Sequence, residues 1–328
     1  MQLSTPEARL AATLTRLWPE ARGAARLGVA VSGGPDSLAL LLLAELAWPG
    51  RVAAATVDHG LRPESAAEAA EVARVCAQLG VPHATLAVAV AEGNVQAQAR
   101  AARYAALADW AQAQGLGAIA TAHHADDQAE TLLMRLNRAS GVAGLAGVRT
   151  RGLVPGSRLP LLRPLLDWRR AELAVVVAEA GLHPADDPSN RNPAFDRVRL
   201  RAGLAGADWL DVPALARSAA HLADADAALD WAAAREWAEN VASEGLGLVY
   251  RPQAPRAVAL RVLARIVAQL GEEGVRGGTL AQAFDLLVAR QPASIGDLVA
   301  RPMPGGWSFM KAPRPRAAAR AAAQPTSD

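Results

Sequence analysis

Between residues 26 and 122 the chain alternates short apolar runs with longer, alanine-rich amphipathic stretches. Short apolar runs bounded by turns are typical of strands in a buried parallel sheet, and amphipathic stretches are typical of the helices that cover it. The pattern predicts strands at 27–31, 52–57, 84–90 and 118–121, separated by helices at 36–46, 64–79 and 95–114. We therefore predict an α/β fold with a doubly wound, mostly parallel sheet that binds ligands at the carboxyl ends of its strands.

The remainder of the chain has a different pattern. A loop and a helix are predicted over 163–181, and a polar stretch rich in Asp and Arg extends from 186 to 201. Further helices are predicted at 213–243, 255–270 and 279–290, with a hairpin around 304–307. We therefore divide the chain into an α/β domain at 1–204, a smaller, mainly helical domain at 205–311, and a low-complexity tail at 312–328 that is predicted to be disordered.

Composition limits the classes of protein to which the chain can belong. Apolar residues make up 52% of the sequence, but no stretch approaches the roughly 20 consecutive apolar residues that cross a membrane. The first residues lack a basic segment followed by an apolar run, so no signal peptide is expected. We predict a soluble, cytoplasmic protein with no membrane partner. The single cysteine, Cys76, excludes disulfides and Cys-ligated metal clusters within one chain and is expected in a helix core.

Positive charge is carried almost entirely by arginine. Lys311 is the sole lysine, and the net charge of +2 gives a pI of about 9.2. Guanidinium groups bind phosphates and base edges in a bidentate manner, so this composition permits a nucleic-acid partner. Codon bias in a GC-rich genome would explain the arginine and alanine content equally well. The sequence predicts no particular oligomeric state.

The clearest chemical signal is the segment SGGPDS at 32–37, which joins the first predicted strand to the following helix. Such a turn directs backbone N–H groups, hydroxyl groups and a helix N-terminus towards one point, which suits an anion such as pyrophosphate. Its two glycines let the backbone approach closely, whereas Asp36 is compatible with phosphate only through a cation such as Mg²⁺. We therefore predict a site for a metal–nucleotide ligand. The predicted contacts are Ser32, Gly33, Gly34, Pro35, Asp36 and Ser37.

Two common nucleotide-binding motifs do not fit this segment. A P-loop requires a lysine after the glycines, and none is present. A dinucleotide fold requires G-x-G-x-x-G after the first strand, and Asp36 would place a negative charge beside the pyrophosphate. The segment instead resembles the motif of the PP-loop, or N-type ATP pyrophosphatase, family, whose members split ATP into AMP and pyrophosphate while they adenylate a substrate. The match is complete at Ser32, Gly33, Gly34, Asp36 and Ser37.

Two further clusters follow predicted strands and should face the same crevice. Asp58 and His59 end the second strand and could contact adenosine or the acceptor, although in isolation such a pair is more commonly a turn and cap. After the fourth strand, Asp127 and Glu130 are three residues apart on one helix face, where they form an acidic pair able to bind an ammonium group or a metal. The adjacent histidine pair before them points in opposite directions on extended chain, which disfavours a zinc site.

Taken in order, these clusters closely resemble the tRNA(Ile)-lysidine synthetase family, whose members join free L-lysine to C2 of the wobble cytidine in the CAU anticodon of a minor isoleucine tRNA. The likeness covers roughly residues 26–202. It includes the AR-x-x-RY helix at 99–104, the SG-x-x-GL-x-G segment at 140–147, RPLL at 163–166 and a D-x-S-N run that begins at 187. Phe195 stands where the family usually has Tyr, and Val198 where it has Asn, so hydrogen bonds from those two positions are not expected.

The resemblance implies ATP and Mg²⁺ as cofactors, with the nucleotide at 32–37, Asp58 and His59 and the metal on Asp36. The cytidine oxygen would attack the α-phosphorus and release pyrophosphate, and the ε-amine of lysine would then displace AMP. Because this amine has a free pKa of about 10.4, a nearby carboxylate must accept a proton, and Asp127 is the candidate. The resemblance implies that the catalytic residues are Asp36, Asp127 and Glu130.

Substrate contacts also follow from the resemblance. Glu130 would help to hold lysine, and Arg197 or Arg199 would bind its carboxylate or the nucleotide phosphate, with a structural ion-pair network as the competing interpretation. Phosphate contacts would hold the anticodon loop while the base leaves its stack. The candidate tRNA contacts are Arg100, Arg103, Arg135 and Arg138. The second domain would hold tRNA, although its tryptophans at 209, 231 and 237, taken alone, are predicted to be core residues.

Three alternatives remain open. Another PP-loop ligase, acting on a small acid with ammonia, would use the same loop but leaves the run at 187–201 unexplained. A tRNA thiolation enzyme normally needs catalytic cysteines or a Cys-held iron–sulfur cluster, which Cys76 alone cannot supply. A non-catalytic nucleotide-binding module is the third, and the presence of both Asp36 and Asp127 argues against it.

Overall fold

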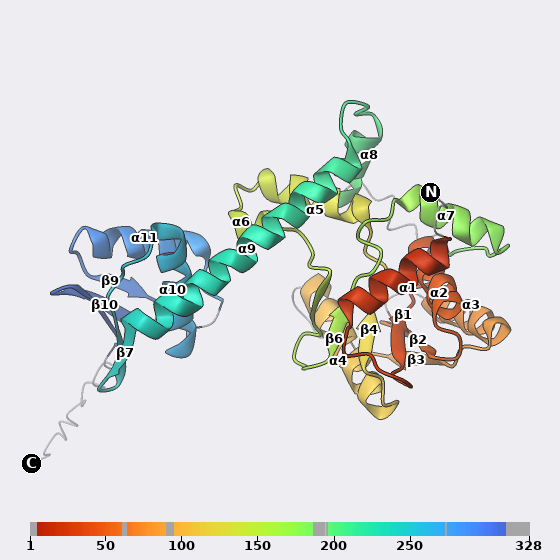
Figure 1. Ribbon diagram of the computed structural model, residues 1–328, viewed down its shortest axis with the longest axis horizontal. Coiled ribbons are helices and arrows are strands. Elements are labelled where there is room, and N and C mark those ends of the chain that lie inside the picture. Colours follow the sequence, from red (N-terminus) through yellow and green to blue (C-terminus); the bar gives the residue numbers. More distant parts are fainter. Residues whose placement is uncertain are drawn as a thin grey trace, which may run out of the picture. The chain divides into compact units, whose positions relative to one another are not determined.

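The computed structural model describes residues 5–60, 64–89, 95–185, 194, 196–272 and 274–312. The chain divides into two compact units, 1–224 and 225–328 (Figure 1). The division falls inside the long helix α9 (Val212–Asn240), so the helix continues through the point where the contacts change. The boundary predicted after residue 204 lies before this helix. The predicted disordered tail lies outside the described residues, apart from Ala312.

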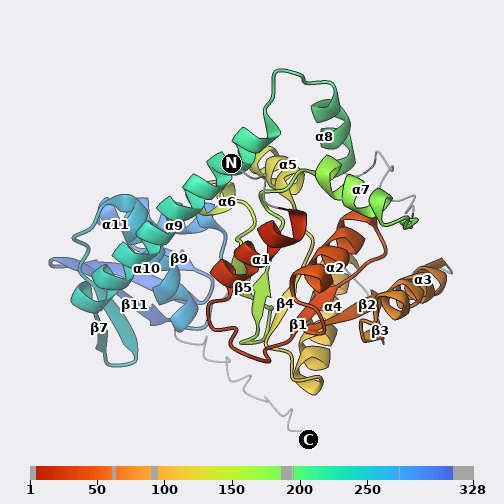
Figure 2. The same cartoon turned by 45° about the vertical axis from the view of Figure 1, so that its right-hand side comes forward.

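The first unit is built on a six-stranded sheet in the order β3-β2-β1-β4-β6-β5 (Figure 2). The strands are β1 (Leu27–Ala30), β2 (Val52–Asp58), β3 (His83–Ala87), β4 (Ala118–Ala120), β5 (Arg151–Leu153) and β6 (Pro160–Leu162). All neighbours pair in parallel except β5, which pairs antiparallel with β6 at the edge. The chain moves outward from β1 to β3 and then returns to the other side of β1. The switch point, where a ligand crevice forms, therefore lies between β1 and β4.

Helices cover both faces of this sheet, as the alternation of side chains along each strand requires. Ala54 and Ala120 belong to the core under α1, α2, α3 and α7, whereas Ala55 and Ile119 belong to the core under α4. These helices are α1 (Pro6–Leu17), α2 (Pro35–Ala47), α3 (Glu64–Leu79), α4 (Val95–Ala113) and α7 (Arg170–Glu179). The predicted doubly wound fold is confirmed, and Cys76 is fully buried in α3, as expected.

Three more helices complete the first unit. They are α5 (Ala125–Leu136), which follows β4 directly, the short α6 (Val142–Leu145), and α8 (Asp196–Ala205), which contacts α5. The sequence pattern did not predict α1, β5, β6 or α8. The two edge strands have only three residues each, too few to show a hydrophobic period.

The second unit combines helices with an antiparallel sheet in the order β7-β8-β11-β10-β9. Its elements after α9 are β7 (Val241–Glu244), β8 (Gly247–Tyr250), α10 (Arg256–Gln269), α11 (Gly277–Val288), β9 (Ala293–Ile295), β10 (Leu298–Met303) and β11 (Gly306–Lys311). The predicted hairpin joins β10 to β11, while the rest of the sheet was not predicted. Trp307 packs edge-on against Tyr250 and Phe284, with ring centroids 5.7 and 5.3 Å away, at the centre of this core.

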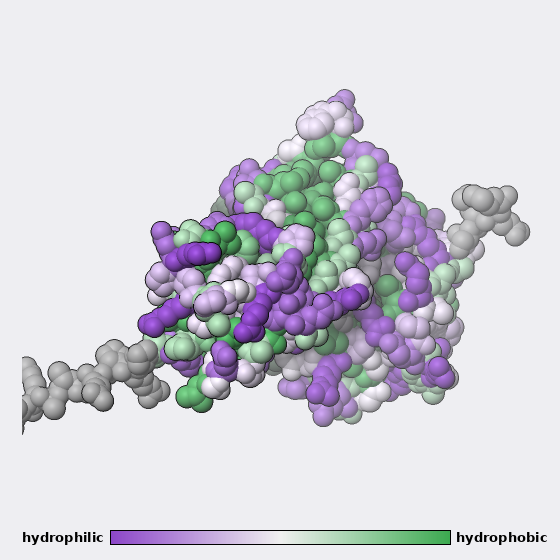
Figure 3. All heavy atoms as spheres, turned by 60° about the vertical axis from the view of Figure 1, so that its left-hand side comes forward, coloured by the Kyte–Doolittle hydropathy of each residue, from purple (hydrophilic) through white to green (hydrophobic). Residues whose placement is uncertain are grey.

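The prediction that the tryptophans are core residues is wrong for two of them. Trp209 lies between α8 and α9 and is 79% exposed, and Trp231 on α9 is 64% exposed, with the Arg235 guanidinium 5.2 Å from its ring centroid. Figure 3 shows one face of the protein, where hydrophilic residues predominate and apolar residues gather in a band near the top of the view. No helix in the described part of the chain is long and apolar enough to cross a membrane.

Close packing between β1 and α4 leaves no room for a side chain at Gly28. A Cβ there would lie 2.8 Å from Cζ3 of Trp110 and 3.0 Å from Cδ1 of Leu116, and both side chains are buried. We expect Gly28→Ala to lower the free energy of unfolding by about 1–3 kcal/mol, because a buried ring must shift. Urea denaturation followed by circular dichroism measures this.

The matched control is Gly203→Ala on α8, where a Cβ would meet no atom within 4 Å. Alanine should leave stability unchanged or raise it there, because alanine favours a helix more than glycine by about 1 kcal/mol. An unfolding midpoint of Gly28→Ala equal to that of the wild type would contradict the close packing described.

Candidate active site

The segment 32–37 forms a tight loop between β1 and α2. Gly33 adopts a left-handed conformation, with φ of +83°, and its carbonyl accepts a hydrogen bond from the Ala185 N–H at 3.0 Å. Ser37 Oγ donates to the Gly34 carbonyl at 2.9 Å and accepts from the Ser32 N–H at 3.1 Å. No side chain caps the N-terminus of α2, which begins at Pro35. The loop therefore presents free helix N–H groups, the arrangement that binds phosphate.

Asp36, in the first turn of α2, faces two cationic side chains. Its Oδ2 lies 3.4 Å from Nε2 of His124 and 3.5 Å from Nη2 of Arg170. Burial by itself would raise the pKa of Asp36, but the hydrogen bond and charge of His124, together with the charge of Arg170, hold it below its usual value. Its other oxygen, Oδ1, is buried and has no hydrogen-bond partner in the described part of the protein.

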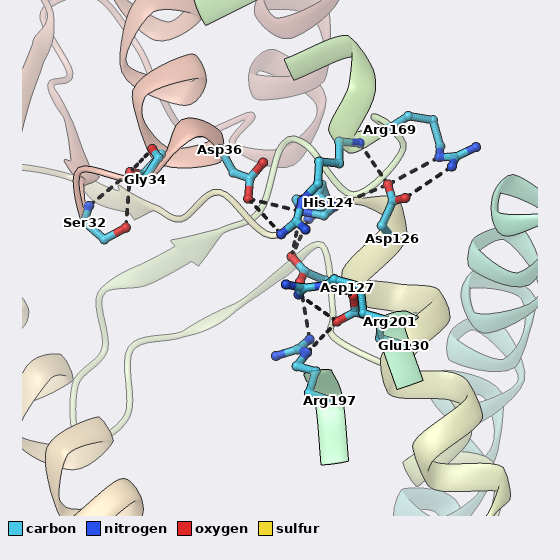
Figure 4. Close-up of polar contacts among 12 residues, drawn as sticks. Ser32, Gly34, Asp36, His124, Asp126, Asp127, Glu130, Arg169, Arg197 and Arg201 are labelled. Carbon is cyan, nitrogen blue, oxygen red and sulfur yellow. Dashed lines mark hydrogen bonds and ion pairs between the residues drawn. The ribbon is translucent and has the colours of Figure 1, made fainter. Parts of the chain in front are cut away.

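His124 lies at the centre of the site, between three carboxylates (Figure 4). Its Nε2 is 3.5 Å from Oδ2 of Asp127, and its Nδ1 is 3.5 Å from Oδ2 of Asp126, in addition to the contact with Asp36. The imidazole is 1% exposed. Burial favours the neutral ring, but hydrogen bonds to Asp126 and Asp36 and the charge of Asp127 raise the pKa of His124 to about 9. The ring therefore carries a positive charge at neutral pH.

Asp126 links the start of α5 to the start of α7. It accepts hydrogen bonds from the Arg170 backbone N–H at 2.8 Å and from the Arg169 guanidinium at 3.2 and 3.3 Å. Burial opposes ionisation of Asp126, but the hydrogen bonds of His124 and of the two arginines lower its pKa well below the usual range. Asp126, in the first turn of α5, thus has specific partners at the start of α7, and its role is to hold the two helices together.

The predicted acidic pair on α5 is brought together with α8. Glu130 is buried, and its carboxylate accepts hydrogen bonds from Nε of Arg197 at 2.7 Å and from Nε of Arg201 at 2.8 Å. Arg197 also approaches Oδ1 of Asp127 at 3.4 Å, and Asp127 Oδ2 accepts from the backbone N–H of His124 at 3.1 Å. The two arginines are four residues apart and share one face of α8.

Arg199 does not join this cluster. It lies two residues from each of the other arginines and therefore points to a different side of α8. There it pairs with Asp196, and its Nη1 donates to the Ala194 carbonyl at 3.3 Å. Sequence reasoning named Arg199 and missed Arg201. The i, i+4 spacing would have distinguished them if α8 had been predicted.

Asp58 and His59, at the end of β2, differ in their hydrogen-bond partners. Asp58 Oδ1 accepts hydrogen bonds from the Gly60 N–H at 2.8 Å and from the Ser65 hydroxyl at 2.7 Å, so it orders its own turn. Nδ1 of His59 is buried and has no hydrogen-bond partner within the described residues. Burial, and after it the charge of Arg103, lowers the pKa of His59. Among the described residues at this strand end, His59 thus keeps a ring nitrogen without a partner.

The predicted tRNA contacts fall into two places. Arg100 and Arg103 on α4 flank the ring of Tyr104, with guanidinium carbons 5.0 and 5.4 Å from its centroid. Arg135 and Arg138 are exposed at the end of α5, where Arg138 pairs with Asp196 at 3.1 Å. The D-x-S-N run and Phe195 lie outside the described residues. The structure thus separates the α4 pair of arginines from the α5 pair.

Besides Arg201, four residues of this site were missed by sequence reasoning as functional candidates: His124, Asp126, Arg169 and Arg170. Only His124 had a sequence signal, because it directly follows the strand at the switch point. The arginines reach the acids through tertiary contacts that no spacing shows. Among the described residues, no group of three or more His, Cys, Asp or Glu side chains is arranged to hold a metal ion.

Comparison with known proteins identifies the class to which this fold and site belong. Residues 6–207 match the family model described as the PP-loop domain, so the fold and the loop at 32–37 together define a PP-loop protein. A tRNA(Ile)-lysidine synthase from Novosphingobium aromaticivorans is 49% identical over 302 residues, which cover 91% of this chain and 93% of the relative. Another from Zymomonas mobilis is 41% identical over 297 residues, covering 88% and 89%. The chain belongs to the tRNA(Ile)-lysidine synthase family.

Among solved structures, the chain is similar to the U34-tRNA thiolase NcsA from Methanococcus maripaludis with its 4Fe–4S cluster. The TM-score is 0.53 at 15% sequence identity, and the match covers 66% of this chain and 76% of that one. A likeness at this identity concerns the fold alone.

The charge on His124 predicts a pH-dependent stability. Its pKa rises from 6.5 to about 9 on folding, so protonation stabilises the folded protein, by on the order of 3 kcal/mol below pH 6.5. This contribution falls as the pH rises through 9. We expect the difference in unfolding free energy between the wild type and His124→Gln to shrink from pH 6.5 to 9.5, measured by urea denaturation with a chelator present.

The groups facing His124 are Asp36 from α2 and Asp126 and Asp127 from α5, with Arg170 of α7 beyond Asp36. The matched control is His221→Gln, which changes an exposed histidine on α9. A constant difference between the wild type and His124→Gln across this range would show that the ring is not charged in the folded state.

Proposed function

We propose that this chain ligates free L-lysine to C2 of the wobble cytidine in the CAU anticodon of a minor isoleucine tRNA, while ATP is converted to AMP and pyrophosphate. The observation that carries the proposal is the position of His124, which lies 3.4 Å from Asp36 of the phosphate loop and 3.5 Å from Asp127. An adenylating centre and a candidate base thus share one crevice. Membership of the lysidine synthase family supplies the substrates.

The loop at 32–37 is the proposed site for the phosphates of ATP, the nucleotide that PP-loop proteins use. Its uncapped helix N-terminus supports this assignment. The unpartnered, buried Oδ1 of Asp36 fits a Mg²⁺ ion held between this carboxylate and phosphate oxygens. Such an ion would neutralise charge that develops on the departing pyrophosphate. His59, with its free Nδ1, is the proposed contact for the nucleoside, and Asp58 keeps its turn in place.

The reaction has two steps in this proposal. The cytidine O2 attacks the α-phosphorus and pyrophosphate leaves; the ε-amine of lysine then attacks C2 and AMP leaves with the O2 oxygen. The ammonium form cannot attack, so a base must take its proton. Asp127 is the proposed base, and its orientation is supported by the His124 backbone N–H at 3.1 Å and by Arg197 at 3.4 Å.

The proposed lysine-binding residues are Glu130 and Arg197. Glu130 was predicted to hold lysine, but it is buried and both of its oxygens accept hydrogen bonds from Arg197 and Arg201, so its acceptor positions are largely occupied. Arg197 is 43% exposed and is the proposed ligand for the lysine carboxylate or a nucleotide phosphate, with Glu130 positioning it. Arg199, the other arginine predicted for this contact, pairs with Asp196 on a different side of α8.

The remaining partners follow from the same proposal. Arg100, Arg103, Arg135 and Arg138 are the proposed contacts for tRNA phosphates, and residues 205–311 are the proposed tRNA-binding part. Since tRNA and free lysine are both cytoplasmic, we propose that the protein works in the cytoplasm.

A thiolation function is the alternative that the fold similarity raises. Sulfur transfer uses thiolates, and the sequence contains one cysteine. Cys76 is fully buried in α3, and burial raises the pKa of its thiol to about 11. These observations favour lysine ligation over sulfur transfer.

The test measures pyrophosphate release from Mg-ATP with a CAU-anticodon isoleucine tRNA transcript and lysine, added separately and together. Asp36→Asn should abolish release, because an amide cannot replace the carboxylate at the cation. Asp127→Asn should still release pyrophosphate with tRNA but should slow the joining of lysine by about 100-fold or more, since only the second step loses its base.

Asp109→Asn, at an exposed position on α4, is the matched control and should behave as the wild type. Release that does not depend on tRNA would indicate a different PP-loop ligase, and a wild type without any turnover would indicate a nucleotide-binding module. Equal loss of both steps in Asp127→Asn would contradict its role as the base of the second step.

A further inference from the structure

A second group of arginines lies close to His123, next to the acidic centre. The guanidinium carbons of Arg100 and Arg103 lie 5.0 and 5.4 Å from the centroid of the buried Tyr104 ring. Tyr104 and Arg100 also act electrostatically on Arg163. Arg163 directly follows β6, beside His123 at the end of β4. Arg100 and Arg103 thus lie at Tyr104 on α4, the helix that covers this face of the sheet, and Arg163 and His123 lie near enough for their charges to interact.

These arginines differ from the others around the site in having no acidic partner. Arg169, Arg197 and Arg201 all form ion pairs, whereas none of the three α4-face arginines lies within ion-pair distance of a carboxylate among the described residues. Arg163 is only 8% exposed, donates from Nη1 to the Arg149 carbonyl at 2.8 Å, and has a buried Nε with no partner there. A buried cation without a counter-ion is costly, so this geometry calls for an anion.

The environment of His123 agrees with this interpretation. Its Nδ1 lies 3.0 Å from the Thr121 hydroxyl. Burial is the main cause that lowers the pKa of His123 to about 4. The charge of Asp127 raises this pKa, whereas the charges of Arg163, Arg197 and Arg100 lower it further. The imidazole is therefore neutral at physiological pH and can donate or accept a hydrogen bond beside the arginines. Positive charge at this place thus belongs to the guanidinium groups alone.

We propose that Arg100, Arg103 and Arg163 form a binding site for a single phosphate group, with Arg163 as its buried anchor. This inference rests on the proposed function, because it assigns a second phosphate to the same substrates. Because the loop at 32–37 is already the proposed site for the phosphates of ATP, we assign the α4-face site to the RNA backbone beside the reacting cytidine.

The experiment compares Arg163→Met and Arg100→Met with the wild type. Binding of the CAU-anticodon tRNA transcript is measured over a range of salt concentrations, and KM for ATP is measured in tRNA-dependent pyrophosphate release. Loss of one phosphate contact should weaken tRNA binding about 10-fold or more and reduce the salt slope by about one, while KM for ATP stays unchanged. A rise in KM for ATP with unchanged tRNA binding would instead assign the site to a nucleotide phosphate.

Controls separate folding from binding. Arg100 is exposed, so its variant should unfold at the wild-type urea concentration, and Arg163→Lys should recover part of the binding because it restores a charge. Arg158→Met, at an exposed position between β5 and β6, removes an arginine outside the cluster and should change neither constant. Wild-type tRNA binding, salt slope and KM in both variants would overturn the inference while leaving the proposed function intact, since that depends on the wild type's turnover.

Discussion

The arrangement of this site depends on one buried charge. The His124 imidazolium is almost completely shielded from water, and such a charge is stable only with close counter-ions. Its three carboxylates come from two helices that follow adjacent strands, β1 and β4, and one of them also binds the start of α7. The position of the phosphate loop relative to α5 is therefore fixed by electrostatics as well as by the apolar core. Neutralising the ring would leave three acids close together without a shared cation.

A similar requirement positions α8. Glu130 is buried on α5, and a buried carboxylate needs partners that satisfy both oxygens. Arg197 and Arg201 provide them from one face of α8, so α8 is held against α5. Because Arg197 also approaches Asp127, the contact that holds α8 in place extends to the candidate base. Structural and chemical roles are thus coupled through one guanidinium group.

The sequence predicted the elements that depend on local hydrophobic pattern. The central strands and the helices α2, α3 and α4 follow from hydrophobic period and turn residues, and the phosphate loop, Asp127 and Glu130 follow from their places after strands. The pairing of Arg169 and Arg170 with acids on other helices was invisible, because it arises only when β4 returns beside β1. The second sheet was missed because its strands are short, with three to six residues each. Exposure of Trp209 and Trp231 was missed because composition assigns tryptophan to cores without regard to the helix face.

The arginines near the site fall into two groups, one with carboxylate partners and one without. Arginines around His124 and Glu130 have carboxylate partners, which balance their charge within the protein. Those beside Tyr104 have none in the described residues, and one of them is buried. Desolvating a guanidinium group without an internal carboxylate destabilises the free protein, and a bound anion would compensate for this cost. An enzyme that adenylates a base within a polyanion has such an anion available next to the reacting atom. The acidic centre and the α4-face arginines then act on one substrate, and binding of the RNA would relieve the cost of the unpaired charge.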